Sequence, residues 1–280
     1  MIRYANAADR KQIRELWEVC FPDESGFNDY FFQHLFCLEN VLLIENNGII
    51  EAMTQMIPRR LQSADGVTEE CTYIYGACTH PAHRRKHLMS QLLERSFALD
   101  RSLGRKASVL IPAEQWLFDF YRIFDYQPSF MLGIQEKNVL PSRNAELSML
   151  SSSDAEEMNA LYKSCIPEET PYLMRDKSEW GRQIAMFSEL GLGCWGKRAS
   201  DGTLEAYAFV WKPDEHTVFI QEIAARSSEV LISVLEDIAA LANVNKVRYS
   251  DLTCLTDRFG CMKRYDDQKV SLAIMNLMMN

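Results

Sequence analysis

A strand that turns directly into a basic segment and a helix carries the most specific chemical signal in this sequence. Residues 73–93 read YIYGACTHPAHRRKHLMSQLL, with Arg84, Arg85 and Lys86 in succession. The first backbone N–H groups of a helix have no partner inside the helix and carry partial positive charge, so they bind anions. A turn of this kind, reinforced by three cationic side chains, is suited to hold a pyrophosphate.

The elements that must position this turn follow from hydrophobic periodicity. A strand is expected at residues 70–79 and a helix at 83–103, where Leu88, Leu92 and Leu99 recur at helical spacing and bury one face. The other expected strands lie at 2–6, 41–46, 49–60, 106–112 and 127–137, and the other helices at 8–21, 27–37 and 115–124. This alternation predicts an α/β fold with a mixed, mostly antiparallel sheet flanked by helices.

The same plan recurs in the second half of the chain. Features of the first half that reappear in order are Asp9, Cys20, Pro22 and the hairpin turn Asn47-Gly48, echoed by Asp154, Cys165, Pro167 and Asp201-Gly202. A repeated order of helix caps, helix stops and hairpin turns indicates one supersecondary plan used twice. We expect two domains, 1–140 and 141–280. The equivalence of Cys20 and Cys165 favours a shared packing position for these two thiols.

The basic turn resembles motif A of the GNAT superfamily of N-acetyltransferases, whose pattern Arg/Gln-x-x-Gly-x-Gly/Ala opens the corresponding helix. Arg84 matches the first position, and His87 and Met89 stand at the two glycine positions. The resemblance implies that acetyl-CoA binds here as a co-substrate, with its pantetheine arm along the strand edge at Ala77 to Thr79. The implied binding residues are Ala77, Cys78, Thr79, Arg84, Arg85, Lys86, His87, Leu88 and Met89. A Cβ at a glycine position restricts how closely the pyrophosphate can approach.

A second motif follows the strand expected at 106–112. Residues 117–126, LFDFYRIFDY, resemble the family pattern F-Y-x-x-x-G-F/Y, with Asp125 in place of the glycine. By this resemblance Tyr121 lies beside the CoA sulfur and returns a proton to the departing thiolate. A phenol with a pKa near ~10 is protonated at neutral pH and suits a thiol leaving group. We expect Tyr121 to be the catalytic acid; a core aromatic with a satisfied hydroxyl is the alternative.

The second half keeps the architecture without these binding motifs. The Arg-Arg-Lys run is similar to the enhanced intracellular survival (Eis) branch, which joins a GNAT domain to a degenerate second one. In the second half the corresponding junction, residues 220–229, has no glycine and no basic cluster, and it carries Glu222 and Glu229. Two carboxylates repel phosphate. We therefore expect only the first domain to bind acetyl-CoA and the second to wall the acceptor cleft.

The overall composition limits the partners. The chain has 39 acidic and 30 basic side chains and a net charge of −9, which disfavours nucleic acid and anionic membranes and suits a small amine or peptide acceptor. The sequence has no apolar run of about 18 residues and no secretory signal at its start, so we place the protein in the cytoplasm. The eight cysteines form no C-x-x-C pair and predict free thiols.

These observations predict an acyltransferase that moves an acetyl group from acetyl-CoA to a primary amine by direct attack. Glu51 and water are the candidates for the base that deprotonates the amine. The alternatives are a non-catalytic module that senses acyl-CoA or binds a protein, and a Fem-type transferase that uses aminoacyl-tRNA, which the acidic net charge disfavours. His80, His83 and His87 have spacing that zinc accepts, but the adjacent cationic side chains oppose a metal ion, and we expect no metal.

Overall fold

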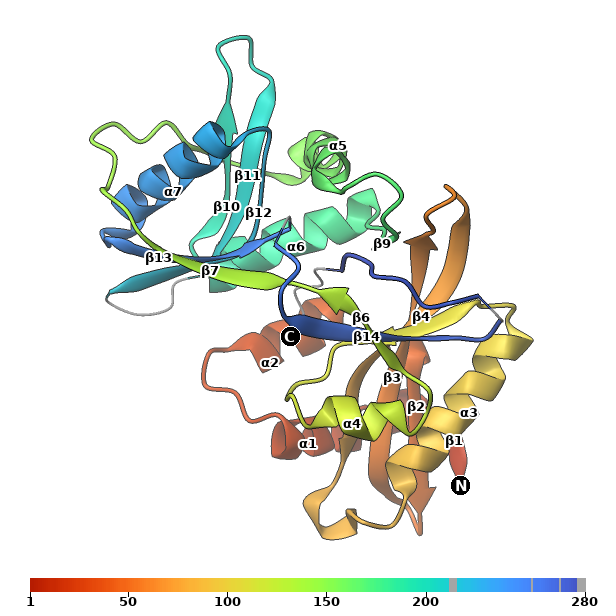
Figure 1. The fold of residues 1–280 in the computed structure, drawn as a ribbon. Coiled ribbons are helices and arrows are strands. Elements are labelled where there is room, and N and C mark those ends of the chain that lie inside the picture. Colours follow the sequence, from red (N-terminus) through yellow and green to blue (C-terminus); the bar gives the residue numbers. More distant parts are fainter. Residues whose placement is uncertain (212–215, 253, 267, 276–280) are drawn as a thin grey trace. The chain divides into compact units, whose positions relative to one another are not determined.

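The chain folds into two compact units, each built around one mixed sheet (Figure 1). The structure is a computed structural model that describes residues 1–211, 216–252, 254–266 and 268–275. Unit 1 consists of Met1–Phe130 and Phe259–Leu272, and unit 2 of Met131–Arg258 and Ala273–Asn280. The predicted fold class, mixed sheets flanked by helices, is confirmed. Within the described ranges, no helix has the length and apolar character needed to span a bilayer.

Unit 1 contains the basic turn and the Tyr121 motif. Its strands are β1 (Ile2–Tyr4), β2 (Val41–Asn46), β3 (Ile49–Gln62), β4 (Thr68–Thr79), β5 (Ala107–Leu110), β6 (Gln127–Met131) and β14 (Arg258–Arg264). Its α-helices are α1 (Arg10–Cys20), α2 (Phe27–Tyr30), α3 (Leu88–Ser102) and α4 (Leu117–Arg122). The strand order is β1-β2-β3-β4-β5-β14-β6; the pairs from β1 to β4 and the pair β5–β14 are antiparallel, and β4–β5 is parallel.

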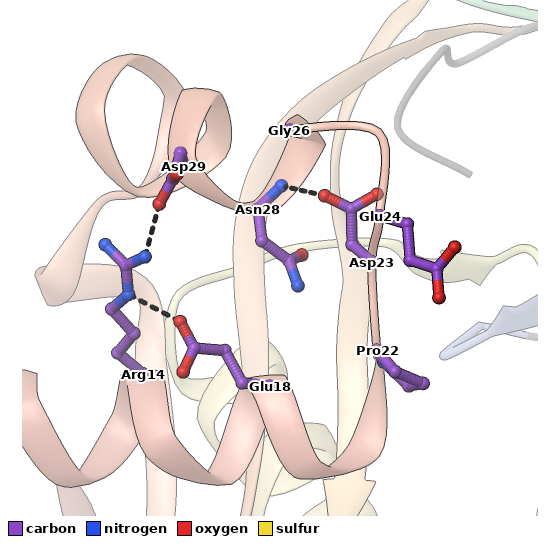
Figure 2. A pocket seen from close by; sticks show the side chains of 8 residues that line it. All are labelled: Arg14, Glu18, Pro22, Asp23, Glu24, Gly26, Asn28 and Asp29. Atoms are coloured by element: carbon purple, nitrogen blue, oxygen red, sulfur yellow. Dashed lines mark hydrogen bonds and ion pairs between the residues drawn. The ribbon is translucent and has the colours of Figure 1, made fainter.

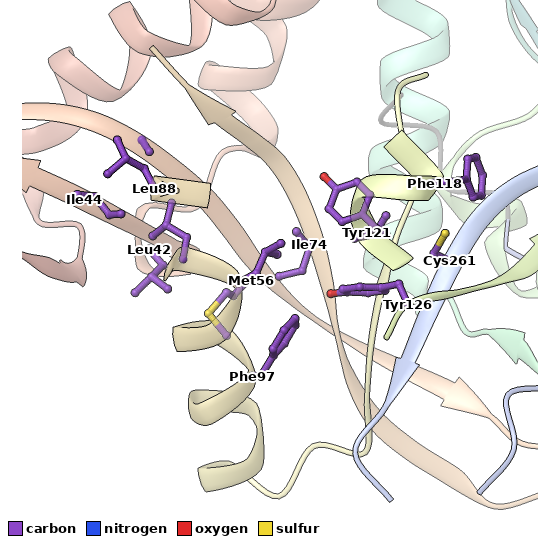
Figure 3. Close-up of a cluster of buried hydrophobic side chains, with 14 residues drawn as sticks. Leu42, Ile44, Met56, Ile74, Leu88, Phe97, Phe118, Tyr121, Tyr126 and Cys261 are labelled. Carbon is purple, nitrogen blue, oxygen red and sulfur yellow. The ribbon is translucent and has the colours of Figure 1, made fainter. Parts of the chain in front are cut away.

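Alternation along β3 shows how the helices cover the two faces of this sheet. Met56 belongs to the buried cluster that includes Leu92 of α3 and Tyr121 of α4 (Figure 3). The neighbouring Gln55 points to the opposite face, where the Trp17 ring of α1 lies. Successive side chains of a strand point to opposite faces. Helices α3 and α4 therefore cover one face of the sheet, and α1 covers the other.

Unit 2 repeats this arrangement. Its strands are β7 (Gly133–Asn138), β8 (Ser148–Met149), β9 (Tyr172–Leu173), β10 (Gly193–Arg198), β11 (Leu204–Trp211), β12 (Thr217–Ala225) and β13 (Lys246–Asp251), and its α-helices are α5 (Ala155–Cys165), α6 (Lys177–Leu190) and α7 (Ser228–Ala242). The sheet order is β7-β13-β12-β11-β10-β8, with β12 and β13 parallel. Val210 of β11 packs in the cluster with Val234 of α7, and Phe209 stacks with Trp180 of α6. The two helical layers again lie on opposite faces.

Each sheet is completed by a strand from the other half of the sequence. β14 lies beside β5 in unit 1, and β7 lies beside β13 in unit 2. The contact-based division of the chain falls between Phe130 and Met131, so β7 precedes the boundary expected at residue 140 and still belongs to unit 2. Sequence periodicity alone cannot assign a strand to a sheet, because partner choice depends on residues far away in the chain.

An ion pair and a hydrogen bond fasten β14 and the residue after it to unit 1. The Arg264 guanidinium donates two hydrogen bonds of 2.9 Å to the Glu69 carboxylate, and the Tyr265 hydroxyl donates one of 2.6 Å to the buried Asp100. Bidentate arginine–carboxylate pairs fix geometry as well as adding energy. These contacts tie a strand from the far end of the sequence to β4 and to the end of α3.

Several expected boundaries require correction. The expected helix at 83–103 begins at Leu88, because residues 81–83 form a 3₁₀ turn and the left-handed residues that follow interrupt a helix. The expected helix at 27–37 is a short α-helix followed by a π-helical turn, and the expected strand at 127–137 is two strands that enter different sheets. By contrast, the strand expected at 41–46 has those bounds in the structure.

A buried ion pair occupies the core of unit 2. Arg175 is 5% exposed and donates a hydrogen bond of 2.9 Å to Glu222, which is fully buried. The guanidinium lies 3.7 Å from the centroid of the Trp180 ring, and the Tyr207 hydroxyl donates to the same carboxylate at 2.7 Å. Removing one member of such a pair leaves an uncompensated charge in a low-dielectric interior.

We expect Arg175→Met to destabilise the protein by about 3–5 kcal/mol, because Glu222 would lose its counter-charge. The matched control is Lys177→Ala, which removes an ion pair with Glu156 whose side chains are 66% and 79% exposed and should change the free energy of unfolding by at most about 1 kcal/mol. Urea unfolding followed by circular dichroism measures both. Equal effects of the two substitutions would contradict this account.

Candidate functional site

Strand β4 separates from β5 halfway along its length. The parallel pairing runs from Cys71 opposite Ala107 to Ile74 opposite Leu110 and ends there. On its other side β4 stays paired with β3, but the register shifts where two residues of β4, Gly76 and Ala77, oppose one residue of β3. An extra residue bends a strand and increases its twist. The bulge therefore turns β4 away from β5, and residues 75–77 are partly exposed although they lie in the interior of the sheet order.

A glycine is required at this bulge. Gly76 has a φ of +58°, in the left-handed region that side chains disfavour. A Cβ at this position would lie 2.3 Å from the Trp17 ring, far inside van der Waals contact. Trp17 is itself fixed by stacking on Phe31 and by a hydrogen bond of 2.7 Å from its indole N–H to Asn28. The bulge is thus held in place by the aromatic packing of α1.

Two buried polar atoms lie opposite the bulge. The Nε2 of Gln55 and the Oγ1 of Thr54 have no hydrogen-bond partner in the described part of the chain, although the residues are 2% and 0% exposed. Gln55 Nε2 lies 3.3 Å from the position that a Gly76 Cβ would occupy. Leaving a buried donor unpaired costs about 1–3 kcal/mol, so such atoms are unusual away from functional sites.

The end of β4 leads into the basic loop and an uncapped helix. Arg84, Arg85, Lys86 and His87 are all exposed. His87 precedes α3 and makes no side-chain capping bond; its carbonyl accepts the first helical bond, from Gln91 N–H at 3.1 Å. The N–H groups of the first turn, from Leu88 to Ser90, are therefore free of capping side chains. Partial positive charge and three cationic side chains meet at this point, as the sequence predicted.

The residues that replace the motif glycines keep glycine-like backbone conformations. Arg85 and His87 have φ values of +62° and +58°, and Asp125 in the second motif has +64°. A left-handed conformation costs roughly 1–2 kcal/mol per residue for a side chain with a Cβ. Met89 differs, because it lies in the first turn of α3. Arg85 and His87 therefore adopt the left-handed backbone conformation that glycine favours, and their side chains are exposed to solvent.

Tyr121 lies beside the point where β4 and β5 separate. It is 8% exposed in the α3–α4 face cluster, and Figure 3 shows its hydroxyl on the side toward Ile74, the last β4 residue paired with β5. Burial and then the nearby Cys261 raise the pKa of this phenol well above its usual value, so it stays protonated. Its hydroxyl has no hydrogen-bond partner within the described ranges, whereas the neighbouring Tyr126 hydroxyl is paired with Ser108 at 2.6 Å.

Glu51 lies at the start of the basic loop. Its carboxylate accepts a hydrogen bond of 2.5 Å from Asn46 and pairs with His83 at 2.9 Å, and its carbonyl accepts from His80 N–H at 2.9 Å. The Lys86 Nζ lies 3.3 Å from the His83 Nδ1, the same ring nitrogen that pairs with Glu51. These contacts give Glu51 a structural role in anchoring the loop to β3.

In unit 2 the position equivalent to Gly76 carries a large buried side chain, and the helix start equivalent to that of α3 has a side-chain cap. Counting from the aligned pairs Ala52–Thr79 and Ala206–Ala225, Gly76 corresponds to the buried Glu222. The expectation that Glu222 repels phosphate at this junction is wrong, because its side chain is buried in the core and paired with Arg175. The pairing of β12 with β13 continues past its bulge to Ile223, and the Ser227 side chain caps α7.

An acidic cavity of about 560 Å³ lies between α1 and α2 (Figure 2). Its lining residues are Arg14, Glu18, Pro22, Asp23, Glu24, Gly26, Asn28 and Asp29. Arg14 is already paired with Glu18 and Asp29, so the carboxylates outnumber the available positive charge. Asn28 connects this cavity to the bulge, because it accepts the hydrogen bond from Trp17.

Three of the residues that shape this site were not predicted as site residues: Gly76, Trp17 and Gln55. The signal for Gly76 was a glycine inside a strand pattern, which often marks a bulge. Trp17 and Gln55 have no such signal, because their roles depend on packing across the sheet. Among the described residues no group of three or more His, Cys, Asp or Glu side chains is arranged to hold a metal ion.

Residues 1–129 match the family model of an acetyltransferase (GNAT) domain. No curated protein matches the sequence at a significant level. The match covers β4, the basic loop, α3 and Tyr121, which are the parts that carried the resemblance in the sequence.

Solved structures with GNAT folds are similar to the chain. A GCN5-related N-acetyltransferase from Anabaena variabilis ATCC 29413 has a TM-score of 0.71 at 16% identity, over 94% of this chain and 71% of its own. Eis1 from Mycobacterium abscessus has 0.61 at 14%, over 89% and 65%. N-myristoyltransferase from Saccharomyces cerevisiae with bound myristoyl-CoA has 0.61 at 12%, over 93% and 80%. At these identities the likeness establishes the fold.

We expect Gly76→Ala to destabilise the protein by about 2 kcal/mol or more, because it combines left-handed strain with a clash against Trp17. His87→Gly is the opposite case at an exposed left-handed position, where glycine relieves strain and stability should be unchanged or should rise. Thermal unfolding of both variants measures the two effects. A Gly76→Ala protein as stable as the wild type would show that the bulge is not fixed by Gly76.

Proposed function

We propose that unit 1 transfers the acetyl group of acetyl-CoA to a primary amine by direct attack, with Tyr121 as the acid that protonates the departing thiolate. The observation that carries the proposal is the early end of the β4–β5 pairing, next to both the basic loop and Tyr121. The open strand edge fits the pantetheine arm of an acyl-CoA molecule, and the anion-binding helix start fits its pyrophosphate. The buried phenol of Tyr121 would lie beside the thioester. The match of residues 1–129 to a GNAT domain supports the same reading.

The pyrophosphate would be held by the start of α3 and the basic loop. The first-turn N–H groups from Leu88 onward have no capping side chain, and Arg84, Arg85 and Lys86 are exposed to solvent. Partial charges at a helix start and exposed cationic side chains act together on a phosphate group. The backbone conformations of Arg85 and His87 fit this use, because they keep the turn that glycine residues would give.

The reactive end would lie between β4 and Tyr121. The edge of β4 at Ala77 to Thr79 has no β5 partner, and a pantetheine arm would lie along it; the Thr79 carbonyl there already accepts from Cys20 and Arg84. Acetyl-CoA supplies a thioester whose carbonyl is polarised by hydrogen-bond donors. The unpaired Tyr121 hydroxyl holds its proton at all physiological pH values and can give it to a thiolate. The Nε2 of Gln55 is a further unpaired donor on the opposite face.

An amine acceptor agrees with the charge around α1 and α2. The carboxylates of the acidic cavity attract a cation, and the chain as a whole carries a net charge of −9. Glu51, a candidate for the base, is engaged by Asn46 and His83 beside the basic loop. Water is therefore the better candidate for the proton acceptor.

One CoA per chain is the expected stoichiometry, because unit 2 fills the corresponding strand position with Glu222 and caps the corresponding helix with Ser227. Calorimetry should give a stoichiometry near one. Arg84→Glu combined with Arg85→Glu should abolish binding, because two charges are reversed at the phosphate site. The matched control is Arg122→Glu on α4, an exposed arginine outside the loop, which should leave binding unchanged. A stoichiometry near two, or binding that survives the double reversal, would refute the one-site assignment.

Tyr121→Phe keeps the ring and its packing and removes only the proton. We expect turnover to fall by roughly 10²–10⁴-fold, while KM for acetyl-CoA and the melting temperature change little. Thiol release from acetyl-CoA across a panel of primary amines measures turnover. Tyr126→Phe is the matched control, since it removes a hydroxyl that is already paired with Ser108 and should affect stability more than turnover. Unchanged turnover in Tyr121→Phe, with CoA binding retained, would favour a non-catalytic acyl-CoA-sensing module.

A further inference from the structure

Two thiols and an arginine meet at the end of β4. The Cys20 thiol, at the last residue of α1, donates a hydrogen bond of 3.6 Å to the Thr79 carbonyl, and the buried Cys78 immediately precedes Thr79 in β4. The Arg84 Nε donates to the same Thr79 carbonyl at 3.4 Å. A half-buried thiol therefore lies between a second thiol and a cation. The proposed acyl transfer uses the backbone of Cys78 but neither of the two thiols.

The internal repeat provides a comparison within the same molecule. Cys165 ends α5 as Cys20 ends α1, and its thiol donates to the Ala225 carbonyl at the same distance, 3.6 Å. The shared packing position expected from the sequence therefore has the same hydrogen bond in both units. The surroundings differ, because the residue before Ala225 is Ala224, whereas the residue before Thr79 is Cys78. The second thiol is thus an addition specific to unit 1.

The surroundings also change the chemistry of the thiol. The hydrogen bond with Cys78, followed by the charge of Arg84, lowers the pKa of Cys20 to about 7. Burial raises the pKa of Cys165, and burial and Glu39 raise that of the exposed Cys37. The thiolate is the form that attacks peroxides and disulfides. At neutral pH Cys20 is therefore ionised to a far greater extent than its counterpart in unit 2.

We propose that Cys20 and Cys78 form an oxidisable thiol pair, with Cys20 as the thiol that attacks a hydroperoxide and Cys78 as the thiol that resolves the product. In the first step the Cys20 thiolate attacks the peroxide, the O–O bond breaks, an S–O bond forms, and an alkoxide or hydroxide leaves. In the second step the Cys78 thiol attacks the sulfenic acid sulfur, the S–S bond forms and water leaves. The peroxide is reduced by two electrons and the two thiols are oxidised.

The disulfide would act on the end of β4. It replaces the Cys20 hydrogen bond to Thr79 and removes a negative charge from beside Arg84. It also links α1 covalently to the strand that the bulge positions. The oxidation site itself depends only on these contacts, so it stands whether or not unit 1 transfers acyl groups.

The test treats the reduced full-length protein with one equivalent of hydrogen peroxide at about pH 7, followed by alkylation and peptide mass spectrometry. We expect a Cys20–Cys78 disulfide that dithiothreitol reverses, with Cys37 and Cys165 still reduced. Cys20→Ser should abolish the disulfide, and Cys165→Ser, the matched control, should leave its yield unchanged. In Cys78→Ala the sulfenic acid on Cys20 should be trapped by dimedone. Oxidation of Cys37 or Cys165 before Cys20, or no Cys20–Cys78 disulfide in the folded wild type, would overturn the proposal.

A second measurement on the wild type does not depend on any variant folding. Iodoacetamide should alkylate Cys20 roughly fivefold faster than Cys165 at about pH 7, because the larger thiolate fraction outweighs the lower nucleophilicity of a less basic thiolate. The Cys20 rate should rise through about pH 7, where its thiol ionises. Equal rates for Cys20 and Cys165 would show that the pair gives Cys20 no special reactivity.

Discussion

The bulge in β4 is the constraint on which the candidate site depends. Two residues, Gly76 and Ala77, take the place of one in the ladder with β3, and the left-handed conformation of Gly76 is held against the Trp17 ring. The extra residue turns the strand, so pairing with β5 ends at Ile74. A polar strand edge becomes available inside a sheet. The basic loop lies at one end of that edge and Tyr121 at the other.

The two units share one supersecondary plan but differ at the strand bulge and at the start of the following helix. In unit 1 a glycine forms part of the bulge, and the neighbouring helix start is uncapped. In unit 2 the corresponding place is Glu222, locked to Arg175, and the helix start is capped by Ser227. Replacing a glycine by one member of a buried ion pair costs desolvation free energy for both charges. Their mutual attraction and hydrogen bonds must compensate for that cost.

Several interactions hold the end of β4 from different parts of unit 1. Glu51 of β3 anchors the loop through His83, and Cys20 of α1 contacts the Thr79 carbonyl. At the opposite end of the strand, Arg264, the last residue of β14, pairs with Glu69. A loop that carries left-handed arginine and histidine residues needs this support, because such conformations persist only where the surroundings fix them. The site is therefore a property of the whole unit.

The sequence by itself determined the secondary-structure types, the repeat and the basic turn. The mixed α/β fold, the strand at Val41–Asn46 and the exposed Arg-Arg-Lys run follow from local periodicity and charge. Only the tertiary structure decided which strands pair, and so it alone assigned β7 and β14 to their sheets, turned Glu222 inward and brought Cys20 to Cys78. The physical reason is that pairing and burial depend on residues far apart in the chain, whereas periodicity reports only which face of a local element is apolar.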